Sequence, residues 1–64
     1  MTKLYRRPTG EVAVIEEQGS QWVAYFWGSE EDYSADMSDD GMWDRCTVSI
    51  AAGTFADALA EVEA

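Results

Sequence analysis

Residues 11–27 read EVAVIEEQGSQWVAYFW, two β-prone runs separated by a short turn that contains Gly19. Such a pair of runs is typical of an antiparallel hairpin, with strands over 11–17 and 21–27. Successive side chains of a strand point to opposite faces, and the second run is apolar at both its odd and its even positions. It therefore predicts a central strand whose two faces are both covered, or one with an exposed aromatic face.

Working outward from the hairpin, two further runs favour strands. Residues 2–6 are short and mixed, which favours an edge strand that stops before Pro8. Residues 43–51 alternate, so that Cys46, Val48 and Ile50 are expected to share one face. The sequence thus predicts a sheet of three to four antiparallel strands.

The end of the sequence carries the pattern of an amphipathic helix. Thr54 is a favourable N-cap, and apolar residues follow at the spacing of one helical face. These residues are Phe55, Ala58, Leu59 and Val62. A helix over 55–63 packed on one sheet face completes a single α+β domain over residues 1–64.

The acidic segment over 29–42 is the least regular part of the sequence. Ser29 followed by Asp32 could cap a short helical turn, and Asp40-Gly41 could form a hairpin turn. We expect a mostly irregular acidic loop here.

Charge is the strongest compositional feature. The 64 residues carry thirteen acids and four bases, for a net charge of -9, and no base occurs between Arg7 and Arg45. Such a protein should be repelled by nucleic acids and anionic membranes and attracted to basic protein surfaces. The alternative is that the acidity only keeps a small protein in solution.

Several kinds of chemistry are disfavoured by the residues that the sequence lacks. It has no histidine, and Cys46 is its only cysteine, so Ser–His and Cys–His nucleophile pairs, internal disulfides and thiolate zinc sites are excluded. We therefore expect no catalysis and no cofactor. No leader or long apolar run is present, which favours the cytoplasm.

The candidate partner-binding surface is the acidic segment with its interleaved aromatic residues. Dense carboxylates can imitate a row of phosphates to a basic groove, and aromatic residues are enriched at interface centres. The candidates are Glu30, Glu31, Asp32, Tyr33, Asp36, Asp39, Asp40, Trp43 and Asp44.

Part of the same segment resembles a calcium loop. Residues 36–44 place oxygen donors at positions 1, 3, 5 and 9 of an EF-hand-type loop, with Gly41 at position 6. Position 12 is Thr47, where a bidentate carboxylate belongs. A solvated acidic loop is favoured over a metal site.

The base-free span 8–44 and the acids of 30–44 resemble, in size and composition, small acidic inhibitors encoded by phages and mobile elements, including anti-CRISPR proteins and DNA mimics. This resemblance implies a non-catalytic inhibitor of a basic, nucleic-acid-binding partner such as a nuclease, without direct binding of nucleic acid. Two alternatives remain. One is an interaction module or antitoxin-like partner that uses an exposed sheet face around Tyr25 and Trp27, which a second copy could also cover. The other is a calcium-stabilised module.

Overall fold

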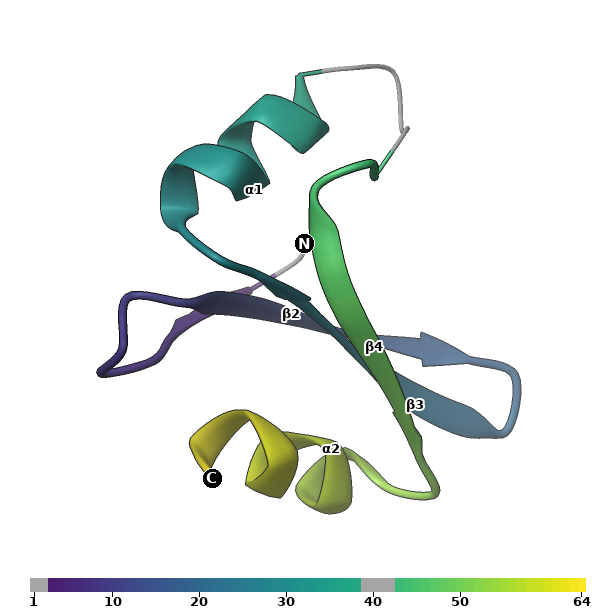
Figure 1. The fold of residues 1–64 in the computed structure, drawn as a ribbon. Coiled ribbons are helices and arrows are strands. Elements are labelled where there is room, and N and C mark those ends of the chain that lie inside the picture. Colours follow the sequence, from purple (N-terminus) through teal and green to yellow (C-terminus); the bar gives the residue numbers. More distant parts are fainter. Residues whose placement is uncertain (1–2, 39–42) are drawn as a thin grey trace.

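The computed structural model describes residues 3–38 and 43–64, which form a four-stranded antiparallel sheet with a helix on each face (Figure 1). The strands lie in the order β1-β2-β3-β4. In chain order the elements are β1 (Leu4–Arg6), β2 (Val12–Gln18), β3 (Gln21–Trp27), α1 (Glu30–Met37), β4 (Cys46–Ala52) and α2 (Phe55–Glu63). The predicted α+β fold, with its antiparallel sheet and C-terminal helix, is confirmed.

The β2–β3 hairpin is the centre of the sheet. Its strands pair in continuous register from Val12 opposite Trp27 to Gln18 opposite Gln21. Gly19 turns the chain with a positive φ of 64°, a conformation that glycine adopts without steric cost. β3 also pairs with β4, so it is an interior strand, as its apolar residues on both faces require.

The two faces of the hairpin support two separate apolar clusters. On the α2 side, Ala13, Ala24 and Phe26 pack with Val62 of the helix. On the α1 side, Val12, Val14 and Trp27 are buried against Tyr33 and Trp43, among others. Alternate residues of the same strands therefore supply both clusters, and each cluster is covered by its own helix.

A bulge in β4 changes which face its first residue occupies. Phe26 pairs with Val48 while the next residue, Trp27, pairs with Cys46, so Thr47 is the additional residue on β4. Cys46 consequently packs with the Trp27 cluster, whereas Ile50 packs with the α2-side cluster. The expectation that Cys46, Val48 and Ile50 share one face is wrong for Cys46, because simple alternation does not allow for the extra residue.

The acidic segment contains a helix where we expected an irregular loop over 29–42. Ser29 caps α1, its Oγ accepting the N–H of Asp32 at 3.2 Å. Glu30, Glu31 and Asp32 occupy the first turn, where the helix dipole favours negative charge. Asp36 is the helix's only fully buried residue, so α1 lacks the apolar stripe by which a helix is usually identified.

α2 covers the opposite face as an ordinary amphipathic helix. Thr54 is its N-cap, and the Thr54 Oγ1 accepts the N–H of Asp57 at 3.1 Å. The Phe55 ring packs edge-on against Trp22, with centroids 5.4 Å apart, and Ala58 and Val62 are buried. In the part of the chain that the structure describes, no helix is both long and apolar enough to span a membrane.

Removal of the α2 cap tests this arrangement. Thr54→Ala should lower the free energy of unfolding by about 1 kcal/mol, because the Asp57 N–H loses its side-chain acceptor. The measurement is urea denaturation followed by tryptophan fluorescence. Thr54→Ser, which keeps the hydroxyl, is the matched control and should remain close to the parent protein. Equal stability of all three proteins would contradict the assignment of the cap.

Candidate partner-binding surface

A buried carboxylate, that of Asp36, joins three parts of the structure. Asp36 is only 3% exposed, and its Oδ2 accepts the indole N–H of Trp27 at 2.7 Å and the backbone N–H of Arg45 at 2.9 Å. Asp36 lies on α1, Trp27 ends β3, and Arg45 immediately precedes β4. Because charge-assisted hydrogen bonds are stronger than neutral ones, this oxygen fixes α1 against the end of the sheet.

Four aromatic side chains, one of them from α1, pack together on the α1 side of the sheet. Trp27 is fully buried, and the rings of Tyr33 and Trp43 meet it edge-on at centroid distances of 5.0 and 5.3 Å. Tyr25 packs edge-on against Trp43 at 4.8 Å. These residues, Tyr25, Trp27, Tyr33 and Trp43, are called the aromatic cluster below. Edge-to-face pairs of this kind stabilise beyond the area that they bury.

Two ion pairs hold α1 from its outer side. Arg45 Nη1 lies 3.0 Å from an oxygen of Asp32, and Arg6 donates two hydrogen bonds to Glu30 at 3.2 and 2.8 Å. Hydrogen bonding to Arg6, aided by its charge, lowers the pKa of Glu30. A carboxylate whose pKa is lowered by folding stabilises the folded protein at pH values above the ordinary pKa of glutamate. This stabilisation is lost as the pH falls through the lowered pKa. Both side chains are exposed, so the contribution is small.

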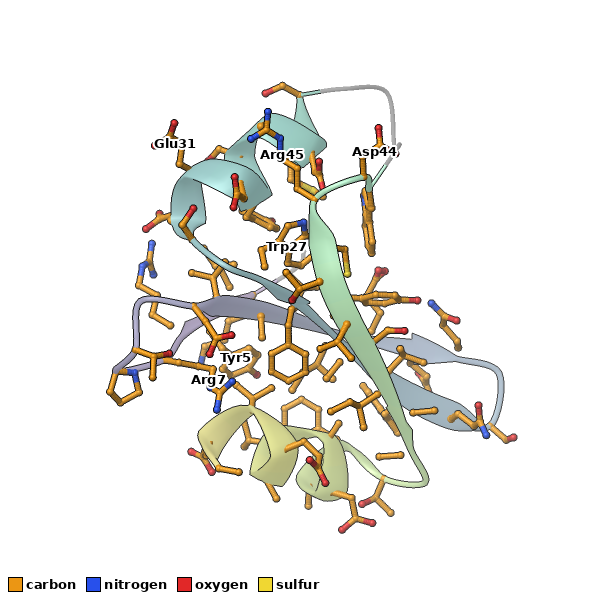
Figure 2. The ribbon with its side chains drawn as sticks, in the orientation of Figure 1. Tyr5, Arg7, Trp27, Glu31, Asp44 and Arg45 are labelled. Atoms are coloured by element: carbon orange, nitrogen blue, oxygen red, sulfur yellow. The ribbon has the colours of Figure 1, made fainter. Side chains whose placement is uncertain are left out.

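Other acids of this region lie on its outward surface. Glu31 and Asp44 are exposed, as is the apolar side chain of Met37. Figure 2 shows Glu31, Arg45 and Asp44 at the end of the molecule that α1 occupies, with Trp27 beneath them. Carboxylates on a helix that is fixed to the sheet can meet a cationic surface without first being ordered.

The structure separates the nine residues predicted to bind a partner into distinct groups. Glu31 and Asp44 are exposed, and Glu30 and Asp32 are held by arginines. Tyr33 and Trp43 are half-buried in the aromatic cluster. Asp36 is buried inside the protein, where it accepts hydrogen bonds from Trp27 and from the backbone of Arg45. Asp39 and Asp40 lie outside the described residues.

The prediction of an exposed aromatic face around Tyr25 and Trp27 is wrong for Trp27. Trp27 is fully buried, because α1 covers the face that we expected to be open. Tyr25 is half-buried and forms a hydrogen bond with Gln18. Of this predicted secondary surface, only Tyr25, with its neighbour Trp43, remains partly accessible.

Only part of the calcium-like pattern lies in the part of the chain that the structure describes. Asp36, its first position, is occupied by hydrogen bonds to Trp27 and Arg45, and Asp40 and Gly41 lie outside the described residues. Within 3–38 and 43–64, no three acidic or cysteine side chains are grouped as metal ligands, and no pocket is found.

Arg6 and Arg45 belong to the site but were not among the predicted residues. The sequence could have indicated Arg45, because it is the only base after Arg7 and it lies next to the acidic segment. A helix that begins after Ser29 also places Tyr33 and Asp36, three residues apart, on one face. Arg6 carried no such signal, since 24 residues separate it from Glu30.

Loss of the buried carboxylate should destabilise the protein strongly. In Asp36→Ala, the Trp27 indole and the Arg45 amide both lose their acceptor, and we expect a loss of about 3 kcal/mol in the free energy of unfolding. Urea denaturation measures it. Glu31→Ala, on the exposed side of the same helix, should change stability by less than about 0.5 kcal/mol.

A double-mutant cycle separates this interaction from a general effect of the substitution. In the background of Trp27→Phe, one of the two donors is absent, so Asp36→Ala should cost less than it does in the parent protein. Equal costs in the two backgrounds would show that the Asp36–Trp27 hydrogen bond does not stabilise the fold.

No protein-family model matches this chain, and no curated protein or solved structure is significantly similar to it.

Proposed function

We propose that this protein is a non-catalytic, cytoplasmic inhibitor that binds the basic surface of a nucleic-acid-binding protein through the exposed acids around α1. The observation that carries the proposal is the placement of Glu31 and Asp44 on a framework fixed by the buried Asp36. An acidic surface meets Arg and Lys side chains where a nucleic acid would otherwise bind, and so competes with it.

The electrostatics of the whole chain support this proposal. With a net charge of -9, the protein is attracted to basic surfaces over a distance of about one Debye length, ~10 Å at 0.1 M salt. Direct binding of a nucleic acid is opposed by the same charge. Arg6 and Arg45 already pair with Glu30 and Asp32. Within residues 3–38 and 43–64, Glu31 and Asp44 are the exposed acids of the site that form no ion pair with an arginine.

The aromatic cluster adds an apolar component next to the acids. Trp43 and Tyr25 are half-buried and in contact with one another, and Met37 is exposed at the end of α1. Aromatic residues and methionine are enriched in the cores of interfaces, where they contribute much of the affinity. In this proposal they anchor the contact and the carboxylates orient it.

The first test is to identify what binds. The immobilised protein is incubated with host lysate at about 50 mM and about 500 mM salt, and a basic nuclease or other nucleic-acid-binding protein should be retained at the lower concentration only. The purified partner should then lose its nucleic acid as this protein is added. Retention of binding at high salt, or simultaneous binding of nucleic acid, would contradict the proposal.

The second test compares two double variants that lose the same charge. Glu31→Gln with Asp44→Asn should weaken partner binding by about tenfold, mainly through slower association, because both acids lie on the proposed surface. Glu17→Gln with Glu61→Gln removes two exposed acids from the hairpin and α2, away from that surface, and should have little effect. Equal loss in both variants would mean that only net charge matters.

A further inference from the structure

The two edges of the sheet differ in how they are protected. β1 spans three residues, ends in Arg6 and is followed closely by Pro8. Short length, charge and proline are the devices by which proteins prevent a sheet edge from pairing with another chain. β4, at the other edge, spans seven residues, and over residues 3–38 and 43–64 no strand pairs with its outer side.

β4 has almost none of these protections. Its sequence, CTVSIAA, contains neither charge nor proline, and the uncharged stretch continues as far as Ala56. The bulge at Thr47 disturbs only the beginning of the strand and leaves residues 48–52 regular. Val48, in this regular part, is 50% exposed although it lies in the middle of the strand. Although the chain has a net charge of -9, the residues of this edge carry no charge.

The regular part of β4 is complementary to itself. Two-fold pairing of two antiparallel copies places the rotation axis perpendicular to the sheet, so residues opposite one another have numbers that are both even or both odd. Val48, Ile50 and Ala52 of one copy would therefore meet the same three residues of the other. Ser49 and Ala51, both small, would meet one another on the opposite face.

This pairing would also extend the apolar cluster beneath α2. Val48 pairs with Phe26 of β3, and Phe26 belongs to the cluster that Val62 covers. Because the rotation axis is perpendicular to the sheet, both α2 helices lie on the same side of the combined sheet. The exposed part of Val48 would then be covered by the second copy's row of apolar residues, in continuity with the existing core.

We propose that β4 is a homodimerisation edge, at which two copies of this chain join their sheets into one antiparallel sheet of eight strands. A second copy fits this edge better than a charged peptide does, since the edge offers no charge for such a peptide to recognise. The large negative charge of each copy opposes association, so added salt strengthens the dimer. This dependence is opposite in sign to that of the proposed basic partner, so either proposal can fail without the other.

The test is the molar mass in solution, measured by sedimentation equilibrium from about 10 µM to about 1 mM protein at low and high salt. The mass should rise from 7.1 kDa towards twice that value with concentration, and at lower concentrations when salt is added. Hydrogen exchange of the β4 amides should slow over the same range. A protein that stays at 7.1 kDa throughout, or that dimerises without protection of β4, overturns the proposal.

Val48→Lys places a charge at the centre of the edge and should weaken the dimer by about tenfold or more. Met37→Lys is the matched control, because it makes the same charge change at an exposed apolar residue of α1, and it should leave the dimer intact or strengthen it. Ser49→Lys replaces Val48→Lys if the latter does not fold, as judged by circular dichroism. Dimers that persist in folded β4 variants overturn the proposal.

Discussion

The acceptor oxygen of Asp36 is the constraint on which the α1 side of this protein depends. It accepts hydrogen bonds from the indole of Trp27 and the backbone amide of Arg45. One atom of α1 is therefore bonded both to the end of β3 and to the residue that precedes β4. A buried carboxylate is costly unless it is well hydrogen-bonded, so α1 is favoured in the position in which Asp36 meets these two donors. Burial of Trp27 and the edge-on packing of Tyr33 and Trp43 follow from that position.

The polar attachment of α1 also explains why the protein can be so acidic on this side. α2 is fixed by apolar contacts, and Val62 of that helix is buried in the core. α1 is fixed by Asp36, by one aromatic ring and by two ion pairs, which leaves most of its surface to polar residues. β3 is apolar on both faces, so each face must be shielded from water by another element. On one face this element is α1, a largely acidic helix. This way of covering the sheet thus leaves room for an acidic surface on α1.

Periodicity and turn chemistry were sufficient to predict most of the sheet and α2, because these elements bury regular apolar patterns. They failed for α1, whose buried face consists of a carboxylate and a half-buried tyrosine and has no apolar stripe. They also failed for Cys46, because a bulge is a tertiary irregularity that alternation cannot reveal. For the site, sequence identified the acidic residues as a group. It could not distinguish Asp36, which is structural, from Glu31, which is exposed, because that difference depends on which face of α1 meets Trp27.

The two proposals assign opposite responses to salt to two regions of the surface. Around α1, exposed carboxylates would attract the proposed basic partner, and ions would weaken that attraction by screening it. Along β4, the proposed pairing would depend on backbone hydrogen bonds and apolar contact, and ions would favour it by screening the repulsion between two acidic copies. The ion pairs Arg6–Glu30 and Arg45–Asp32 belong to the first region, so the arginines of that region moderate its charge without cancelling it. The two proposed surfaces need not compete, because one lies over α1 and the other along the outer side of β4.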